Sequence, residues 1–455
     1  MNATDIKEFT RRRNRVLQMM GSGAIAIIKA ASEQPRNRDV DYPYRPDSDF
    51  FYLTGFPEPE AVAVLIPGRR QAQYVLFCRE RDADAETWHG RRAGLEGARD
   101  TYGADDAFPI TDIDDILPGL MENRDRVYYA MGHHEDFDKK IMGWLNQVRG
   151  RARAGVHAPG KFVALDHLLH EMRLIKSRYE IGLMRRAAEI SAAAHCRAMA
   201  VCKPGMSERR IEAELLHEFM SADARSPAYP SIVGGGENGC ILHYTENDAP
   251  LSDGDLLLID AGAEYRCYAA DITRTFPVNG HFSAAQRALY DVVLAAQRAA
   301  IDKVRPGNHW NEPHDAAVKV LTRGLVKLGI LKGQPAKLIK DEAYRRFYMH
   351  RTGHWLGMDV HDVGDYKVDG RWRMFEPGMV LTVEPGLYIP VGSKGVAKKW
   401  WNIGIRIEDD VLVTRDGHEV LTSGVPKDAE EIEALMAGSG VRVQTAKRTR
   451  KRAGA

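Results

Sequence analysis

Two hydrophobic patterns divide the chain. In roughly the first 170 residues, short apolar runs at 24–30, 61–67, 74–78 and 126–130 alternate with stretches in which apolar residues recur at helical spacing. Strand-length runs separated by helical segments are typical of an α/β unit around a mixed sheet. The pattern therefore predicts a first domain over residues 1–173. Within it, the aromatic-rich stretch 41–56 is predicted as a packed loop and strand, with a role in shaping a site or an oligomer contact left open.

A second pattern occurs twice in the remainder of the chain. Ser177 and Glu180 have the spacing of a capping box, and an apolar helical face follows until a Lys-Pro-Gly triplet. About a hundred residues later, Ser283 and Gln286 open a similar helix that ends at Arg-Pro-Gly. In both copies a further helical stretch and then strands follow. This weak repeat predicts a second domain, residues 174–438, built from two related halves packed face to face.

Charge is concentrated at the C-terminal end. The formal net charge is +1, yet the last fifteen residues contain six basic and no acidic side chains, so the rest of the chain carries −5. Such a run is typical of a solvated, disordered terminus, and we assign residues 439–455 to a basic tail. Contact with nucleic acid is the less favoured interpretation of it.

The five cysteines are scattered, with no Cys-x-x-Cys pair, which argues against a disulfide framework or a zinc knuckle. No signal-peptide pattern and no apolar run of about 20 residues is present, so we predict no membrane span. These features favour a reducing, cytoplasmic location.

Candidate chemistry begins with two aspartates. Asp260 and Asp271 flank two apolar runs that suggest strands joined by a tight turn. If the turn is centred between Tyr265 and Arg266, the two aspartates face each other directly, with Cβ atoms about 5 Å apart. Two buried carboxylates that close require a shared proton or a cation between them.

A glycine-rich segment contributes three histidines, His350, His354 and His361. The first two have the spacing of a helical zinc-protease motif, but Arg351 occupies the position of the required glutamate and Gly353 disfavours a helix, which excludes that motif. A lone histidine is more often structural than a ligand. Three within twelve residues, beside Gly and Asp, indicate a site.

Two glutamates lie in apolar strands. Glu384 ends a strand that runs into a Pro-Gly turn, and Glu408 continues a strand of alternating isoleucines, where Arg406 shares its face. Either glutamate alone would be read as a surface charge or an ion pair. Inside apolar strands, however, an unpaired charge is costly, so both are candidates for a site.

Four carboxylates and one imidazole form an oxygen-rich ligand set, listed in chain order as Asp260, Asp271, His354, Glu384 and Glu408. Their four negative charges match two divalent cations. Such ligands favour Mn²⁺, and less strongly Co²⁺ or Mg²⁺, over structural zinc. Two ions about 3.5–4 Å apart can activate a water and polarise a carbonyl, so amide hydrolysis is the expected chemistry.

Gly234, Gly235 and Gly236 raise the question of a phosphate loop, but no Gly-Lys-Ser/Thr follows. The triplet is predicted as a flexible loop bordering the site. His243 follows closely and either reaches the cavity or is structural.

The ordered ligand set within DAG, ADITR, TGH, VEPG and RIED segments resembles the pita-bread metallopeptidase family, which includes methionine aminopeptidase, prolidase, creatinase and aminopeptidase P. The resemblance covers about residues 174–425. The segments PYRPDSDFFYLTGFPEPEAV and ETWHGRR resemble the amino-terminal domain of bacterial aminopeptidase P. The resemblance implies an α/β (α+β) chain, in which a mixed-sheet domain precedes a pita-bread catalytic domain with pseudo-twofold halves.

The resemblance also implies roles for the ligands. Asp260 would bind one ion, Asp271 and Glu408 would bridge both, and His354 and Glu384 would complete the other ion's shell. A metal-bridging hydroxide would attack the scissile carbonyl, and Glu384 would carry the proton to the leaving nitrogen.

Further residues receive roles by the same resemblance. His361 and His243 would steady the substrate carbonyl and the tetrahedral intermediate. The proline side of the pocket would be lined by His350, Tyr388 and Arg406. Trp88 resembles an aromatic that family members lend to a neighbouring subunit, which implies a homo-oligomer, a tetramer or a dimer.

The implied activity is that of an Xaa-Pro aminopeptidase, acting on peptides with proline second. An Xaa-Pro bond has no N–H, which a general protease would use, whereas a compact pocket of rings can hold the pyrrolidine. A prolidase restricted to Xaa-Pro dipeptides shares every ligand and stays an alternative. A non-catalytic peptide-binding module is a third possibility, although such modules typically lack the ligands that this chain retains.

Overall fold

The computed structural model describes residues 3–438 in two compact units, one ending at Met172 and the other beginning at Arg173. The predicted basic tail, 439–455, lies outside the described residues. Within residues 3–438, no helix has both the length and the apolar character needed for a bilayer span.

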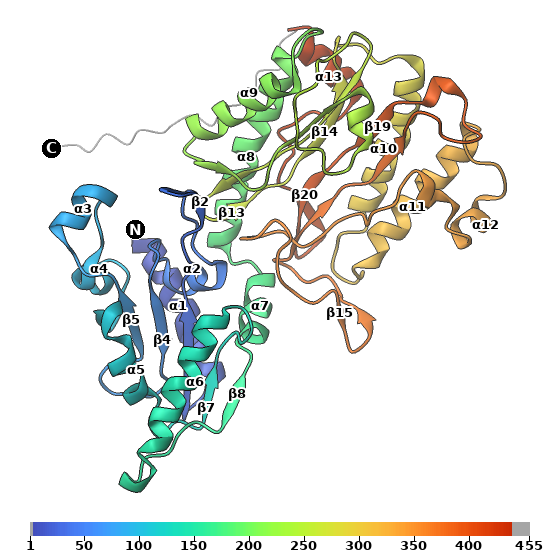
Figure 1. Cartoon of the computed structure of the whole chain (residues 1–455). Helices are drawn as coiled ribbons and strands as arrows, with labels where there is room; N and C mark the ends of the chain where they lie inside the picture. Colours follow the sequence, from blue (N-terminus) through green and yellow to red (C-terminus); the bar gives the residue numbers. More distant parts are fainter. Residues whose placement is uncertain (1–2, 439–455) are drawn as a thin grey trace, which may run out of the picture. The chain divides into compact units, whose positions relative to one another are not determined.

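A mixed six-stranded sheet forms the centre of the N-terminal unit, in the order β6-β5-β4-β1-β7-β8 (Figure 1). Its strands are β1 (Ala24–Lys29), β4 (Val62–Leu65), β5 (Tyr74–Cys78), β6 (Asp106–Pro109), β7 (Arg126–Tyr128) and β8 (Lys161–Val163), and a small hairpin adds β2 (Pro35–Asn37) and β3 (Val40–Asp41). The β1–β4 and β4–β5 pairs are antiparallel and the other three are parallel. All four predicted apolar runs are strands, so the predicted mixed sheet is confirmed.

Helices of this unit are α1 (Ala3–Met20), α2 (Ser48–Thr54), α3 (Ala83–His89), α4 (Gly94–Asp100), α5 (Ile113–Met121), α6 (Glu135–Gly150) and α7 (Asp166–Leu174). Apolar side chains of α5 and α6, such as Leu117 and Trp144, pack with those of the sheet into one buried cluster. Helix α2 corrects the prediction of loop and strand for 41–56. Asp47 caps it by accepting from the Phe50 amide at 2.8 Å, and Gly55 ends it at a φ of 63°.

Two pairs of long helices belong to the second unit, α8 (Arg178–Val201) with α9 (Glu208–Ser221), and α10 (Ala284–Ile301) with α11 (Asn311–Lys327). Capping boxes open α8 at Ser177 and Glu180 and α10 at Ser283 and Gln286, as predicted. Shorter helices are α12 (Pro335–Lys340) and α13 (Ala429–Met436).

Each helical pair precedes a three-stranded antiparallel sheet, ordered β10-β11-β14 in the first half and β17-β20-β21 in the second. These strands are β10 (Ile232–Gly235), β11 (Leu256–Asp260), β14 (Thr273–Pro277), β17 (Val380–Val383), β20 (Asp409–Val413) and β21 (His418–Val420). Smaller sheets use β9 (Ser226–Pro227), β12 (Ala263–Tyr265), β13 (Tyr268–Ala269), β15 (Lys367–Val368), β16 (Arg371–Trp372), β18 (Gly386–Ile389) and β19 (Ile403–Arg406). The predicted two halves are therefore present.

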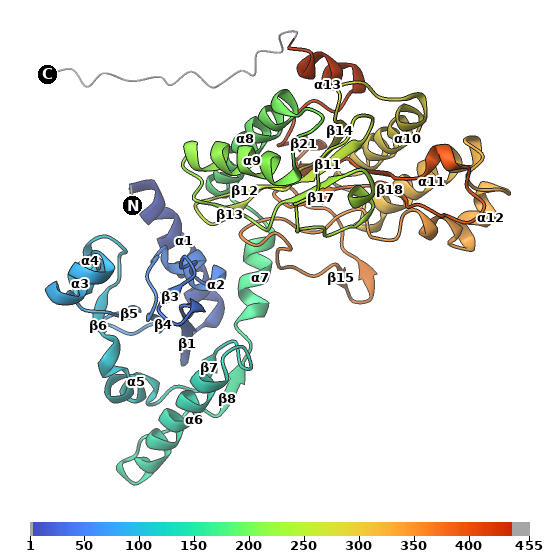
Figure 2. The same ribbon diagram turned by 45° about the horizontal axis from the view of Figure 1, so that its top comes forward.

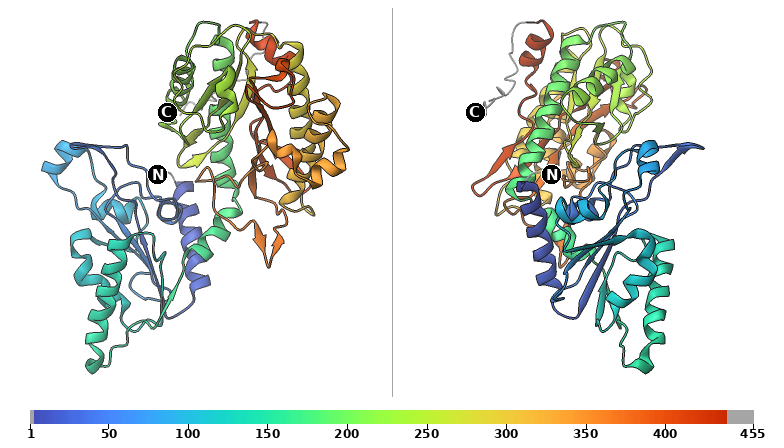
Figure 3. Two further views of the ribbon diagram at one scale, coloured as in Figure 1. Left: turned by 45° about the vertical axis from the view of Figure 1, so that its right-hand side comes forward. Right: turned by 90° about the vertical axis from the view of Figure 1, so that its left-hand side faces the viewer.

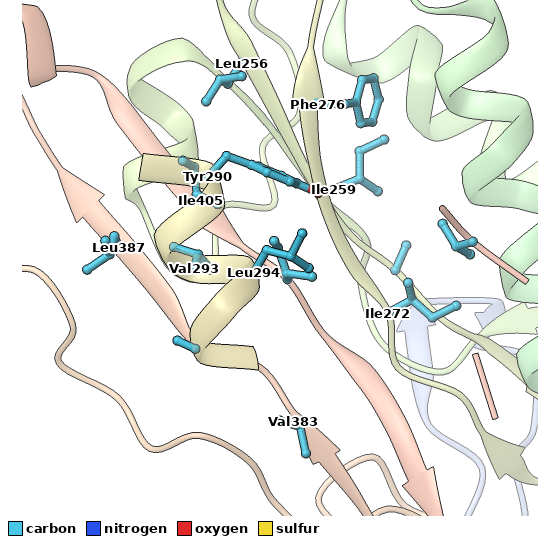
Figure 4. Packing of buried hydrophobic residues seen from close by; sticks show 14 of the residues in the cluster. Leu256, Ile259, Ile272, Phe276, Tyr290, Val293, Leu294, Val383, Leu387 and Ile405 are labelled. Carbon is cyan, nitrogen blue, oxygen red and sulfur yellow. The ribbon is translucent and has the colours of Figure 1, made fainter. Parts of the chain in front are cut away.

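The core of the second unit lies where the strands meet the helices. Figures 2 and 3 show α8 and α9 on one side of the strands and α10 and α11 on the other. In Figure 4, Val293 and Leu294 of α10 lie beside strands that carry Ile259 and Ile405, and all four belong to one buried cluster. This packing holds the strand ends, and hence the polar side chains on them, in place.

One predicted loop is instead a strand. Gly234 and Gly235 belong to β10, and Gly234 pairs with Leu258 of β11. Glycine is needed at 234 because the backbone of Asn238 packs closely against it: a Cβ on Gly234 would lie 2.9 Å from that backbone. The prediction of a flexible loop is therefore wrong for these two residues.

Candidate metal centre

The first pair of acids lies where the strands of the first half are interrupted. The turn is centred one residue later than predicted, because Arg266 and Cys267 both adopt positive φ, 53° and 64°, as in a type I′ hairpin. In this register Asp260 faces Thr273. Asp271 is therefore a diagonal neighbour of Asp260 on the same face, and the predicted direct opposition is wrong.

Tyr229 connects the two aspartates. Its hydroxyl lies 2.6 Å from Asp260 Oδ1 and 2.5 Å from Asp271 Oδ1. A hydroxyl has one proton, so it can donate to only one of them at a time. Burial and both carboxylates raise the pKa of Tyr229 well above its usual value, so it stays protonated. Two acid oxygens thus converge on a single neutral group.

A second pair of acids lies at a matching interruption in the other half. Strands β17 and β18 pair with β20 and β19 in one continuous register, which is broken at 384–385 and 407–408. By that register Glu384 is opposite Glu408. Pro385 has no N–H to donate to a ladder, which favours the break. Glu408 was predicted inside a strand; it lies in this break instead.

Hydrogen bonds join the two halves at these interruptions. The Glu408 amide donates to the Thr273 carbonyl at 3.0 Å, and the Thr273 hydroxyl donates to Glu408 Oε2 at 2.6 Å. Arg406 Nη2 donates to Asp260 Oδ2 at 2.6 Å. The acids of both halves therefore belong to one site.

His354 reaches the same site from a non-helical loop. Its Nδ1 lies 3.0 Å from the Trp355 carbonyl oxygen. A carbonyl oxygen can only accept a hydrogen bond, so Nδ1 carries the proton and donates it. Nε2 then lies 3.4 Å from Asp271 Oδ2 and 3.9 Å from Glu384 Oε1. Gly353 allows this approach, because a Cβ there would lie 2.0 Å from a carbonyl oxygen of β17. The imidazole is held as a metal-binding imidazole is held, with its second nitrogen bonded to a carbonyl.

Electrostatics indicate that the buried Arg406 does not balance the negative charge of the site. Burial raises the pKa of Glu384 to about 7, and burial with the neighbouring carboxylates raises the pKa of Glu408 well above its usual range. Burial also raises the pKa of Asp260. Burial alone would lower the pKa of His354, but Asp271 and Glu384 raise it to about 9.

Crowded carboxyl groups with raised pKa values are what a site for divalent cations requires when no ion is bound. Asp271, His354 and Glu408 each offer a ligand atom, and these atoms all lie within 4.8 Å of one another. Asp260 adjoins the group through Tyr229, and Glu384 adjoins it through His354. Two divalent ions would replace the protons that the crowded carboxylates otherwise require.

A chain of polar groups runs from this site. His350 Nε2 lies 2.9 Å from the Tyr388 hydroxyl, which accepts from Arg406 Nη1 at 3.0 Å. His350 Nδ1 is 3.7 Å from Glu384 Oε2. Burial lowers the pKa of His350 to about 3, so its ring is neutral and can donate or accept at neutral pH.

The remaining predicted residues lie at the margin or elsewhere. The His361 ring is centred 4.3 Å from the His354 ring. His243 is exposed, and it is within electrostatic range of the site, since a positive charge on its ring would lower the pKa of both His350 and His361. Trp88 belongs to α3 of the N-terminal unit, where it is 81% exposed, and its role in an oligomer stays a prediction.

Sequence reasoning missed three contributors, Tyr229, Thr273 and Asp410. The last accepts a hydrogen bond from the Asp271 amide at 3.1 Å. Asp410 had a signal, since Glu-Asp-Asp within an apolar strand is unusual. Tyr229 had none, because it is brought to the aspartates from a separate segment about thirty residues earlier.

Comparison with known proteins agrees with this geometry. Residues 182–415 match Metallopeptidase family M24, and residues 9–128 match the aminopeptidase P N-terminal domain. The chain is 50% identical to the Xaa-Pro aminopeptidase of Escherichia coli, over 96% of this chain and 99% of that protein. It is 45% identical to the Xaa-Pro aminopeptidase of Haemophilus influenzae, over 94% and 97%.

Solved structures agree as well. The aminopeptidase PepP of Pseudomonas aeruginosa superimposes with a TM-score of 0.95 at 62% identity, covering 95% of this chain and 98% of that one. A variant of E. coli aminopeptidase P in complex with substrate gives 0.93 at 50% identity, covering 95% and 98%. By its strand register, its buried acids and these matches, the chain belongs to metallopeptidase family M24, with an aminopeptidase P N-terminal domain.

Proposed function

We propose that this protein is an Xaa-Pro aminopeptidase, which releases the N-terminal residue from peptides with proline in the second position. The observation that carries the proposal is the largely buried group of four acids and one imidazole at the paired strand interruptions of an M24 fold. Half of the residues are shared with a relative of that activity over nearly its full length, which supports the same assignment.

The residues that would hold two divalent ions are Asp260, Asp271, His354, Glu384 and Glu408. Asp271 would be shared, since it contacts both Tyr229 beside Asp260 and His354 beside Glu384. When bound, such ions lower the pKa of water and polarise the scissile carbonyl. Oxygen donors predominate, which supports Mn²⁺.

Glu384 is suited to move the proton. In the metal-free site burial raises its pKa to about 7; bound ions would lower that pKa and keep the carboxyl group deprotonated, ready to accept a proton from water and pass it on. The amine that leaves an Xaa-Pro bond is the proline nitrogen, which must be protonated to depart. We assign that transfer to the Glu384 carboxyl oxygen.

The polar chain beside the acids would hold the substrate. His350, Tyr388 and Arg406 would line the proline side, where their mutual hydrogen bonds fix the shape of a pocket for a ring without an N–H. His361 and His243 would steady the substrate carbonyl and the tetrahedral intermediate from the edge of the site.

One assay tests the proposal against a prolidase. Purified protein, stripped of metal and reloaded with Mn²⁺, should cleave an Xaa-Pro-Yaa tripeptide much faster than the matching Xaa-Pro dipeptide. An Xaa-Ala-Yaa tripeptide is the matched control for the proline requirement. Faster turnover of the dipeptide would assign a prolidase, and no turnover of either would favour a binding module.

We also propose a cytoplasmic homo-oligomer in which Trp88 reaches a neighbouring site. The free cysteines support a reducing compartment, and the exposure of Trp88 leaves it available for such a contact. Trp88→Ala should lower kcat/KM for a tripeptide without lowering the melting temperature. Sedimentation gives the subunit count, and a fully active monomer would contradict this assignment.

A further inference from the structure

Four side chains with metal-binding atoms gather on the N-terminal unit, outside the centre described above. Asp49 lies in the first turn of α2. Asp166 and His170 are one turn apart on α7 and therefore share a face of that helix. His133 lies in the loop between β7 and α6. Three separate parts of the chain thus converge, none of them used by the proposed reaction.

Distances within the cluster suit one ion. Asp49, Asp166 and His170 each offer a ligand atom, and these atoms all lie within 4.8 Å of one another. His170 Nε2 is 3.5 Å from Asp49 Oδ2, and His133 Nε2 is 3.8 Å from Asp166 Oδ2. Around a tetrahedral zinc ion with bonds of about 2.1 Å, ligand atoms are about 3.4 Å apart. The three mutually close atoms and the His133–Asp166 distance are near that spacing, and His133 would complete the set by turning about its side-chain bonds toward the other two ligands.

The cluster is recessed beside a cavity. Asp49, Asp166 and His133 line a space of about 40 Å³, enough for an ion or a water. The side chains of Asp49, Asp166 and His170 are 21–32% exposed, whereas that of His133 is 61% exposed. Three donors are thus largely enclosed by the fold, and the fourth lies at its surface beside Asp166.

Other charged groups at the cavity favour a cation. Asp47 adds a further carboxylate to its lining, and the basic side chains there are Lys29, His133 and His134. The Lys29 ammonium is directed away into its own loop, donating to Ser32 Oγ at 2.9 Å and to the Ala30 carbonyl at 3.2 Å. Three carboxylates, Asp47, Asp49 and Asp166, therefore outnumber the single ammonium, and the imidazoles of His133, His134 and His170 lie among them.

We propose that Asp49, His133, Asp166 and His170 form a second metal site, which binds one zinc-class transition-metal ion. Two nitrogens and two oxygens differ from the oxygen-rich set of the catalytic unit, and they suit tetrahedral Zn²⁺ or Co²⁺ better than Mn²⁺. The ion joins α2, α7 and the loop before α6. Because it binds only the folded arrangement, it stabilises the N-terminal unit.

The test separates this site from the catalytic centre by using the full chain with Asp271→Ala and Glu408→Ala. After removal of metal, this protein should bind one Zn²⁺ per chain in calorimetric titration and should give the visible absorption of tetrahedral Co²⁺. Adding His170→Ala should weaken the zinc affinity by at least about tenfold and abolish that absorption.

Matched variants make the result specific. His167→Ala removes an exposed histidine from the same helix and should leave the zinc affinity unchanged. Asp49→Asn keeps the size of the side chain and should weaken zinc like His170→Ala, which covers the case in which the latter does not fold. Zinc binding that is absent from the double variant, or that survives both substitutions, overturns the proposal. Neither result bears on the peptidase activity.

Discussion

Two adjacent acids in the second unit, Glu408 and Asp409, are equally deep in the protein and differ in their partners. Asp409 is 0% exposed and accepts from Arg274 Nη2 at 2.7 Å and Lys427 Nζ at 2.6 Å. Burial alone would raise its pKa, but these two cations hold the pKa of Asp409 at about 2. Glu408 is 2% exposed and accepts from the neutral Thr273 hydroxyl, and its pKa lies well above the usual range.

Burial therefore does not distinguish a structural acid from a functional one in this protein. What distinguishes them is whether the chain supplies the compensating charge. Asp409 is neutralised by Arg274 and Lys427, whereas Arg406 beside the metal centre pairs with Asp260 and Glu408 accepts from a neutral hydroxyl. The two roles are coupled, because Arg274 also donates to the carbonyls of Glu408 and Thr273 and so fixes the backbone of the metal centre.

The largest expected effect comes from Glu408→Gln. With one ligand charge lost, kcat/KM on an Xaa-Pro-Yaa tripeptide should fall by at least about a thousandfold, because bound metal ions lower the activation barrier by several kcal/mol. The metal-free variant should melt at no lower temperature than the parent, since the raised pKa of Glu408 already keeps its carboxyl group neutral there and Gln is a neutral group of the same size. Metal content and melting curves check this, and a marked loss of stability would contradict it.

Asp409→Asn should have the opposite profile. It leaves Arg274 and Lys427 buried without their carboxylate, so the free energy of unfolding should fall by about 3 kcal/mol. Urea unfolding of the metal-free proteins measures the difference, with Glu408→Gln as the matched control. If Glu408→Gln lowers the free energy of unfolding more than Asp409→Asn does, the proposed contrast between an acid paired with cations and an acid without them is wrong.

The pH dependence sharpens the same contrast. In the metal-free protein the pKa of Glu384 is raised from 4.5 to about 7 and that of His354 from 6.5 to about 9, so the folded state holds extra protons. Its stability should therefore fall as the pH rises from about 5 to 9. Metal affinity should increase by about tenfold per pH unit through the upper part of that window, as His354 loses its proton. Calorimetric titration with Mn²⁺ at several pH values measures the metal affinity, and melting of the metal-free protein over the same range measures its stability. A metal affinity or a melting temperature that does not change with pH would contradict the corresponding trend.

Tyr388→Phe should have the smallest effect. It removes the hydroxyl that joins His350 to Arg406 and lies outside the set of acids. We expect kcat/KM to fall by about tenfold, as for the loss of one or two buried hydrogen bonds, with metal content unchanged. Steady-state kinetics with metal analysis measure this, and loss of bound metal would move Tyr388 into the metal centre.

Local patterns allowed much of this protein to be predicted. Capping boxes at Ser177 and Ser283 determine where long helices begin, because the side chain and the amides that it satisfies are neighbours in sequence. Apolar runs identified four of the six strands of the N-terminal sheet, β1, β4, β5 and β7. The acids were noticed because charged residues in apolar strands need a reason, and the motifs around them pointed to the family that the comparisons confirm.

Pairing between distant segments decided the rest. The turn at Arg266 and Cys267 shifted the register of Asp260 and Asp271, and helix α2 formed where a loop and strand were expected. The contact of Arg406 with Asp260 spans 146 residues, and no local pattern encodes it.

The sequence by itself thus determined which chemical groups this protein has and which local elements carry them. Only the tertiary structure decided that Asp409 meets its own cations while Glu408 does not. That outcome depends on which strands pair and at what register, and those pairings are set by packing of the whole unit.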